Sequence, residues 1–390
     1  MKQVLVLDAN QRSALATTRS LGLQGVIIFT ADDTPSSLAG SSRYSRQYSR
    51  YPSPAIHPDE FIASICKLVK ALEISIIIPM TELTTNLLLQ YRQALPEIIL
   101  PFPDLKTIDS LADKCSLMHL AKKQQIPIPK TWFVNSPDNL PVTLTALPYP
   151  IILKPGKSWL FDGNKWIHTN VRIADTPEMA REILDTDHGF HTHPFMLQEC
   201  VTGIGQGLFA LYDKGKAVAF FTHRRLREKP PSGGVSVLSE SVPIDPVLRE
   251  HACSLLDSAK WHGIAMVEFK VGDDGTPYLM EINTRFWGSL QLAIDAGVDF
   301  PWLLYKTACG EPIKPVQHYK IGTRLRWLLG DLDSLYLSLR DTDNSILNKI
   351  SAIKQFLTPA PFSTRHEVNR WHDIRPFWWE LKQYVKDILK

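Results

Sequence analysis

The spacing of short apolar runs in the first part of the chain constrains the fold most strongly. Such runs occupy residues 4–7, 25–30, 74–79 and 98–100, with helix-compatible stretches at 13–21, 61–72 and 83–95. Apolar strands that alternate with helices are typical of a parallel sheet covered on both faces. Sheets of this kind bind ligands beyond the carboxyl ends of their strands, here near Asp8 and Thr81-Glu82. Residues 1–110 are therefore predicted to form a Rossmann-like α/β domain.

The turn after the first predicted strand, residues 8–12, contains no glycine. A dinucleotide-binding fingerprint needs glycines at this turn so that the backbone can approach a pyrophosphate. The turn therefore argues against a dehydrogenase. The segment 36–51, rich in Ser, Arg and Tyr, is isolated and is predicted to be a surface loop rather than a nucleic-acid site.

The pattern changes near residue 149, where shorter strands are separated by turns that contain Gly and Asp. Strands are predicted at 150–154, 195–200, 208–212, 217–222, 265–271 and 277–282, and helices at 177–184 and 246–260. This pattern indicates an antiparallel sheet with a few helices. After residue 310 comes an aromatic terminal helix, 371–389, which is expected to pack on the body or a partner subunit rather than on a membrane.

Charge and cysteine content exclude several classes of protein. The chain has 43 Lys and Arg against 40 Asp and Glu, a net charge of +3, which argues against a nucleic-acid-coating protein. No run of about 18 apolar residues is present, so no transmembrane helix is expected. The N-terminus does not fit a secretory signal, and the five scattered cysteines fit reduced thiols, so we expect a cytoplasmic protein.

One predicted hairpin carries two acidic residues that point to a metal site. Asp274-Gly275 is a favoured two-residue hairpin loop between the strands 265–271 and 277–283. Counting outwards from this loop places Glu268 opposite Glu281, with Asn283 on the same face. Facing carboxylates repel each other, and a hard cation with a further amide-oxygen ligand removes that penalty. We therefore predict a Mg²⁺ site; the alternative is a solvated hairpin with unrelated acids.

Two basic residues near strand ends fit the same chemistry. Arg285 lies two residues beyond Asn283, where a guanidinium is suited to a phosphate or a carboxylate, although an ordinary surface arginine is an equal alternative. Lys154 ends an apolar strand, where its ammonium group is placed either against phosphates or towards solvent. Neither residue is specific alone.

In this order the motifs resemble the ATP-grasp superfamily, the fold of biotin carboxylase, carbamoyl phosphate synthetase and D-alanine–D-alanine ligase. The resemblance covers roughly residues 1–310 and rests on Asp113-Lys114, on Lys154, on Gln198-Glu199-Cys200-Val201 followed by Gly203, on Glu268, and on Glu281-Ile282-Asn283-Thr284-Arg285. It implies α/β and α+β architecture: a pre-ATP-grasp domain at 1–110, a central subdomain at 111–190, a second subdomain with the metal site at 191–310, and a helical, aromatic-rich extension at 311–390.

The resemblance also implies roles for individual residues. Lys114 and Lys154 would contact the phosphates of ATP, Glu199 would lie at the adenine amino group, and the backbone of Cys200 and Val201 would bind the ring edge. Glu268, Glu281 and Asn283 would hold Mg²⁺, with Mn²⁺ as a substitute, and Glu281, Asn283 and Arg285 would act in catalysis. The loop 155–159 has fewer glycines than many family phosphate lids, and Thr284 replaces a common proline.

The substrate residues are less constrained. The basic run that precedes Gly233-Gly234 is either a solvated face or a loop that closes over an acidic substrate, with Arg227 and Gly234 as the expected contacts. The function predicted is an ATP-dependent ligase that activates a small carboxylate as an acyl phosphate and joins it to an amine, an amino acid or a similar compound, with release of ADP and phosphate. The alternatives are activation of an enol or another oxygen before addition of an amino acid, and a non-catalytic ATP-binding protein. No nucleic acid or membrane partner is expected, and a homodimer is left open.

Overall fold

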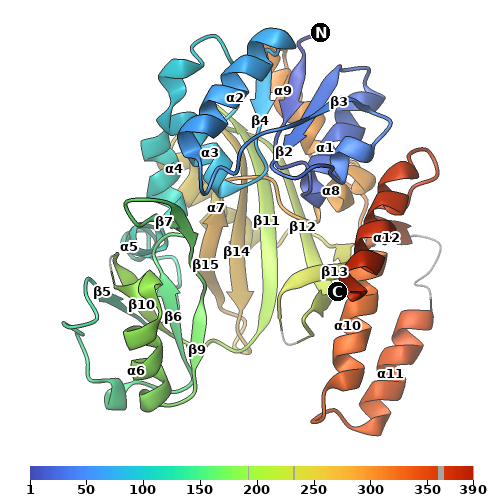
Figure 1. Ribbon diagram of the computed structural model, residues 1–390. Coiled ribbons are helices and arrows are strands. Elements are labelled where there is room, and N and C mark those ends of the chain that lie inside the picture. The colour runs from blue at the N-terminus through green and yellow to red at the C-terminus, as the bar shows by residue number, and fades with distance from the viewer. Residues whose placement is uncertain (192, 232, 359–363, 390) are drawn as a thin grey trace.

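The N-terminal domain of this computed structural model is built on a four-stranded parallel sheet (Figure 1). The structure describes residues 1–390 except 192, 232, 359–363 and 390. The sheet has the order β3-β2-β1-β4. Its strands are β1 (Val4–Val6), β2 (Ile28–Asp32), β3 (Ser45–Arg50) and β4 (Ile76–Ile78). The surrounding helices are α1 (Arg12–Leu23), α2 (Pro58–Ala71) and α3 (Glu82–Gln90). The next helix, α4 (Leu105–Ala112), instead packs against the following helix and against residues 277–283. The predicted parallel sheet is confirmed.

Two predictions for this domain were wrong. The segment 36–51 is not all loop, because residues Ser45–Arg50 form β3 and pair in parallel with β2. β3 is an edge strand whose side chains are partly exposed, so it lacks the apolar run that marks a buried strand. Residues 98–100 form no strand; Ile99 makes only an isolated parallel bridge to Ile76.

The central region is a four-stranded sheet of order β5-β10-β6-β9 with antiparallel neighbours. Its strands are β5 (Thr131–Val134), β6 (Ile151–Pro155), β9 (Arg172–Ala174) and β10 (Phe195–Glu199), accompanied by α5 (Lys114–Lys123) and α6 (Pro177–Thr186). A small hairpin, β7 (Trp159–Phe161) and β8 (Trp166–His168), follows β6. The subdomain boundary expected at residue 190 falls before β10, which lies in the middle of this sheet.

A seven-stranded sheet of order β15-β14-β11-β12-β13-β16-β17 forms the middle of the molecule (Figure 1). Its strands are β11 (Ile204–Asp213), β12 (Lys216–Lys229), β13 (Val235–Ser241), β14 (Gly263–Val271), β15 (Pro277–Asn283), β16 (Arg324–Arg326) and β17 (Thr364–His366). The associated helices are α7 (Pro246–Ser258), α8 (Leu290–Ala296) and α9 (Phe300–Cys309). Because β16 and β17 join this sheet, the region after residue 310 is not purely helical.

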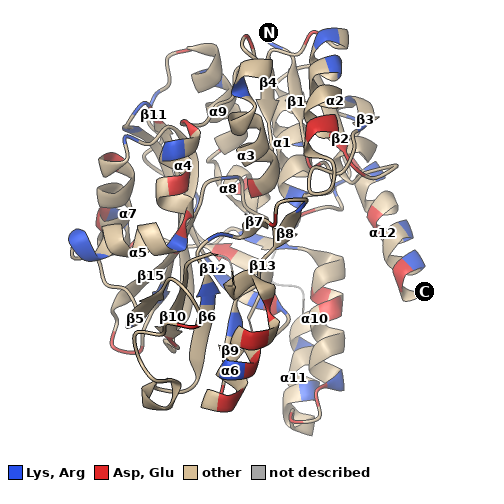
Figure 2. Cartoon of the chain, turned by 60° about the vertical axis from the view of Figure 1, so that its left-hand side comes forward, with Lys and Arg blue, Asp and Glu red and all other residues tan. Residues whose placement is uncertain are grey.

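The C-terminal region adds α10 (Leu328–Arg340), α11 (Ile346–Leu357) and α12 (Arg375–Ile388). As predicted, α12 packs on the body: Trp379 donates to Ser36, and Glu380 accepts from the Trp327 indole. The acidic residues of α10 lie in its first half, and α12 carries both acidic and basic residues (Figure 2). Within the described part of the chain, no helix is both long and apolar enough to cross a bilayer.

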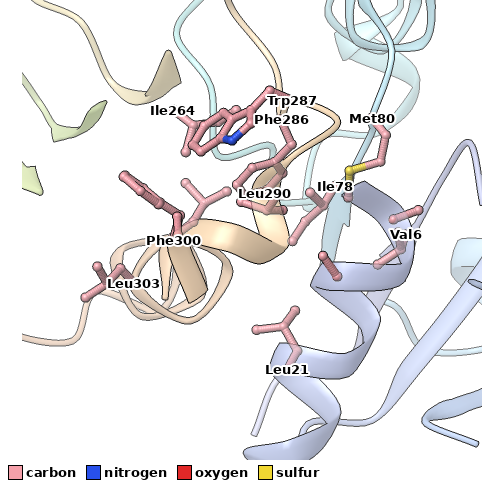
Figure 3. Packing of buried hydrophobic residues seen from close by; sticks show 14 of the residues in the cluster. Val6, Leu21, Ile78, Met80, Ile264, Phe286, Trp287, Leu290, Phe300 and Leu303 are labelled. Atoms are coloured by element: carbon pink, nitrogen blue, oxygen red, sulfur yellow. The ribbon is translucent and has the colours of Figure 1, made fainter. Parts of the chain in front are cut away.

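One apolar cluster joins the N-terminal domain to the seven-stranded sheet. Val6, Leu21 and Ile78 of the first domain belong to the same buried cluster as Phe286 and Trp287, which follow β15 (Figure 3). Burying apolar surface contributes roughly 25 cal/mol per Å² to the free energy of folding. Side chains in such a core pack about as densely as molecules in an organic crystal. The N-terminal domain is therefore held in a fixed position against the end of β15.

Candidate active site

Two carboxylates face each other across the hairpin formed by β14 and β15. Glu268 and Glu281 are register partners, and Asn283 lies two residues beyond Glu281 on the same strand. The Asn283 side-chain amide donates to Glu268 Oε1 at 3.1 Å and to Glu281 Oε1 at 3.0 Å. The structure therefore brings these three residues together, as the spacing predicted.

The register near the turn differs from the prediction, because the loop is longer than two residues. Val271 pairs with Pro277, and of Asp274 and Gly275 only Gly275 has the positive φ, +81°, that a type I′ loop requires at both positions. A β-bulge then leaves Met280 without a partner between Leu279 and Glu281. The bulge shifts the register by one residue and restores the Glu268–Glu281 pairing. The pairing was thus predicted correctly from an incorrect loop.

The two carboxylates are electrostatically unequal. Burial, followed by the nearby Glu281 carboxylate, raises the pKa of Glu268. The pKa of Glu281 is lowered, because Lys114, Lys154, the Asn283 amide and Arg285 outweigh the effect of burial. The site therefore retains at least one ionised carboxylate at neutral pH and has a second that a cation would stabilise in its ionised form.

The donor set fits a hard divalent cation that is shared with phosphate groups. Two carboxylates and one amide supply oxygen ligands, and rotating the Asn283 amide by 180° presents Oδ1 to the same point. Among the described residues, no group of three or more His, Cys, Asp or Glu is suited to hold a metal. Mg²⁺ is commonly held by one or two carboxylates together with substrate phosphates and water, so the residues present fit that role.

Two buried lysines reach this acid pair from the neighbouring sheet and helix. Lys114 begins α5, and its ammonium lies 3.6 Å from Glu281 and 3.3 Å from the Ser158 hydroxyl. Lys154, on β6, donates to the Met280 carbonyl at 3.2 Å and to Gln198 Oε1 at 3.4 Å. Burial lowers the pKa of Lys154. A buried ammonium with few protein partners is suited to an anionic ligand.

The residues expected to hold an adenine connect the two sheets. Glu199 is the exposed last residue of β10, and Cys200 and Val201 follow it before β11 begins at Ile204. Gly203 has φ +142°, and a Cβ there would lie 2.1 Å from the Val271 carbonyl oxygen, so only glycine fits. The contacts of these residues with a nucleotide stay a prediction.

The arginines of β12 point in two directions. Arg225 lies 3.2 Å from Glu268 and also contacts Glu228 and the Gly234 carbonyl. Arg227 instead forms a two-pronged ion pair with Asp331 of α10, at 2.6 and 2.7 Å. A bulge that leaves Leu226 unpaired separates them, so Arg225 pairs with Ser239 and Arg227 with Leu238. Ser239 and Leu238 are neighbours on β13 and face opposite sides of the sheet, so their partners Arg225 and Arg227 do the same. Arg227 is therefore turned away from the acid pair.

A cavity of about 200 Å³ lies beside the acid pair. Its lining includes the predicted residues Glu268, Glu281, Asn283, Arg285 and Gly234, together with Arg12, His223, Arg225, Ser236, Trp287 and Ser289. Arg285 donates only to the Phe286 carbonyl within the described part of the chain. Burial lowers the pKa of His223 to about 3, so this histidine is neutral beside the Ser289 hydroxyl, 2.9 Å away. Arg227 does not line the cavity.

Sequence reasoning missed Arg12, His223 and Arg225 as site residues. His223 and Glu268 both pair with Gly207 of the strand between them, and so lie on one face. Once the strand order is known, the pairing of Gly207 with both Glu268 and His223 identifies His223 as a site residue. Because side chains alternate between faces along a strand, Arg225, two residues further, is then expected on the same face. Arg12 comes from the first domain, and no local pattern in the sequence connects it to the hairpin.

Comparison with known proteins agrees with this geometry. Residues 192–330 match the model of a family described as ATP-grasp in the biosynthetic pathway with Ter operon. The structure is similar to an L-amino acid ligase from Bacillus licheniformis, with TM-score 0.61, 14% identity, and coverage of 80% of this chain and 75% of that one. No curated protein matches the sequence significantly.

Two further solved structures contain nucleotides. The biotin carboxylase domain of Hydrogenobacter thermophilus 2-oxoglutarate carboxylase, solved with MgADP and bicarbonate, has TM-score 0.65 at 14% identity, covering 83% of this chain and 73% of that one. Carboxyaminoimidazole ribonucleotide synthase from Aspergillus clavatus, complexed with ATP, has TM-score 0.60 at 15% identity, covering 83% and 80%. The predicted ATP-grasp resemblance and fold class are confirmed.

Proposed function

We propose, starting from the ATP-grasp fold of this chain, that it is an ATP-dependent ligase which joins a small-molecule carboxylate to an amine and releases ADP and phosphate. One observation carries the proposal. Two buried lysines from the central region face a pair of opposed carboxylates on the seven-stranded sheet. This juxtaposition of cations and metal-type ligands suits a polyphosphate with its divalent ion.

The nucleotide side of the site is the edge where the two sheets meet. Lys114 and Lys154 would bind phosphate oxygens by charge-assisted hydrogen bonds. Glu199 and the backbone of Cys200 and Val201 would hold the adenine at the connection between the sheets. Glu268, Glu281 and Asn283 would hold Mg²⁺, or Mn²⁺ in its place. The ion, when bound, neutralises charge on the phosphates during transfer.

The acid side of the site is the cavity lined by Arg285 and Arg225. A carboxylate oxygen of the acid attacks the γ-phosphorus, the bond to the ADP oxygen breaks, and ADP leaves with the electron pair. The amine then attacks the acyl carbon of the acyl phosphate, phosphate departs, and the amine loses a proton to solvent. Arg285 has unused donors and would bind the transferred phosphoryl oxygens. Positioning and charge neutralisation supply the catalysis, and no side-chain nucleophile is needed.

Hydroxylamine trapping tests the proposal without knowledge of the amine. A panel of small carboxylic acids is incubated with Mg·ATP and hydroxylamine, and ADP and hydroxamate are measured. Acid-dependent formation of both products in equal amounts is expected. Acid-dependent ADP release without hydroxamate would favour activation of an enol or another oxygen. Nucleotide binding with no turnover on any acid would favour the non-catalytic alternative.

Calorimetry tests the nucleotide site separately. A non-hydrolysable ATP analogue is expected to bind with Mg²⁺ and to bind much more weakly in EDTA. Lys154→Ala removes a buried phosphate contact and is expected to weaken binding about tenfold or more. Lys123→Ala, an exposed lysine on α5, is the matched control. Metal-independent binding, or equal binding by Lys154→Ala and Lys123→Ala, would contradict the assignment.

The setting of the reaction is also part of the proposal. All five cysteines are free, which suits a reducing compartment, and we place the enzyme in the cytoplasm. A homodimer stays a prediction.

A further inference from the structure

We propose that Arg12, brought from the N-terminal domain, binds a carboxylate of a substrate that does not take part in the reaction, so that one of the two substrates carries a second, unreacting acid group. The inference rests on the proposed function and adds a substrate class to it. The group is carried either by a dicarboxylic acid or by an amino acid that serves as the amine. The experiment below separates these two sources.

Arg12 lies in the same cavity as the acid pair, although it belongs to another domain. It is the first residue of α1 and lines the cavity of about 200 Å³ together with Glu281 and Arg285. Its Nη2 lies 3.1 Å from the position that a Cβ would take at Gly288, so glycine leaves room for the guanidinium. Arg12 and Arg285 therefore present two cationic groups to one small space, beside the two carboxylates that would hold the metal.

The guanidinium of Arg12 is fixed in place but keeps free donors. Glu367 Oε2 accepts from Nη1 at 2.6 Å, and the guanidinium lies 4.0 Å above the Trp327 ring. Nε and Nη2 donate no hydrogen bond to any described residue. The side chain is only 12% exposed, so water satisfies these donors poorly. An arginine with a fixed fork and spare donors is suited to bind a carboxylate with two hydrogen bonds.

Stability alone does not explain an arginine at this position. The N-terminus of a helix carries a partial positive charge, so a cation in its first turn is unfavourable. The partner Glu367 is almost completely buried, and its Oε1 has no hydrogen-bond partner among the described residues. Burying such a pair costs desolvation energy that its attraction does not reliably recover. A ligand that accepts hydrogen bonds from Nε and Nη2 of Arg12 would account for an arginine at this position.

The position of Arg12 relative to Arg285 is set by packing. The apolar cluster that contains Val6 and Ile78 also contains Ala14, two residues after Arg12, and Phe286, which directly follows Arg285. Figure 3 shows part of this cluster. The cavity is smaller than the roughly 300–1,000 Å³ of sites for drug-sized ligands. We therefore expect a substrate of few carbons whose unreacting carboxylate is bound by the Arg12 guanidinium.

The test compares carboxylates with their uncharged amides, using protein saturated with the Mg²⁺ complex of a non-hydrolysable ATP analogue. The first arm titrates succinate and glutarate against succinamate and glutaramate. The second arm titrates glycine and L-alanine against their amides. In at least one arm, the compound with the additional carboxylate is expected to bind tenfold or more tightly than its amide. The responding arm identifies whether the acid or the amine carries the group.

Arg12→Met is expected to reduce that preference to less than threefold, while binding of the ATP analogue is unchanged. Arg12→Lys keeps the charge but not the fork, and an intermediate preference is expected. Arg249→Met, an exposed arginine on α7, is the control. The inference is overturned if no arm shows a preference, or if both Arg12 variants keep the full preference. If the wild-type protein did not bind the ATP analogue, the proposed function would be refuted instead.

Discussion

Two strand pairs of the seven-stranded sheet, one on each side of β11, each contain a β-bulge, with opposite consequences for the site. In β14–β15 the unpaired Met280 brings Glu281 opposite Glu268. In β12–β13 the unpaired Leu226 turns Arg227 away towards Asp331 and leaves Arg225 facing Glu268. One inserted residue exchanges the two faces of a strand. Whether a residue of such a strand faces the site therefore depends on its position relative to the bulge. Its residue type alone does not identify it as a site residue.

The largest effect is expected at the acid that the first bulge positions. Glu281→Gln removes a charge at the point where charge develops during phosphoryl transfer, so kcat is expected to fall by about 10³-fold or more, and nucleotide affinity by much less. ADP release with the acid identified by trapping gives kcat, and calorimetry gives the affinity. Glu250→Gln, an exposed acid on α7, is the control. Normal turnover by Glu281→Gln would show that the hairpin holds no catalytic metal.

The next largest effect is expected at Arg285, which follows β15 and lies two residues beyond Asn283. A preorganised donor of this kind typically contributes about 10²–10³-fold to kcat. Arg285→Ala is expected to lose this factor, and Arg285→Lys most of it, since lysine lacks the planar fork. Steady-state ADP release checks both variants. Rates within about threefold of wild type in both would remove Arg285 from the mechanism.

The comparison of the two arginines of β12 is sharpened by a matched pair of substitutions. Arg225→Met removes a cation beside Glu268 and is expected to lower kcat/KM by about 10–100-fold, with little change in stability. Arg227→Met takes one cationic partner from Asp331, which is 1% exposed, and is expected to lower the free energy of unfolding by about 1–3 kcal/mol, with little change in kcat/KM.

Steady-state kinetics of both variants give the change in kcat/KM, and thermal melting gives the change in stability. If Arg227→Met lost activity while Arg225→Met kept it, Arg227 and not Arg225 would be the substrate contact of β12.

The smallest effect is expected at Glu380, outside both strand pairs. Burial raises the pKa of this carboxyl to about 7, and the Trp327 indole, whose ring lies under Arg12, donates to it. The folded protein thus keeps a proton that the unfolded chain has lost between about pH 4.5 and 7, so this group makes the free energy of unfolding fall as pH rises through that window.

Glu380→Gln keeps an acceptor for the indole and has no proton to lose. The variant is expected to melt a few degrees above wild type at pH 8 and at nearly the same temperature at pH 5. Thermal melts at both pH values check this difference. An equal difference at both values would show that Glu380 is not the titrating group.

The sequence by itself determined the elements and the chemistry of the hairpin. Continuous apolar runs between helices predict a parallel sheet, because a strand buried on both faces needs apolar residues at every position. Glu268, Glu281 and Asn283 were predicted to share one face because side-chain direction along a strand is a local property. The ordered lysines and acids were enough to indicate the ATP-grasp resemblance, which the fold confirms.

Only the tertiary structure decided which residues complete the site. A bulge depends on the packing of both strands and has no local signature, so Met280 and Leu226 were not predicted to be unpaired. β3 has no apolar run, because an edge strand gains its hydrogen bonds from its neighbour without being buried. Arg12 reaches the cavity from another domain, because an apolar cluster between residues more than 200 positions apart fixes the two domains together. Such contacts are set by the free energy of burying surfaces that are distant in the chain, and no spacing within one segment encodes them.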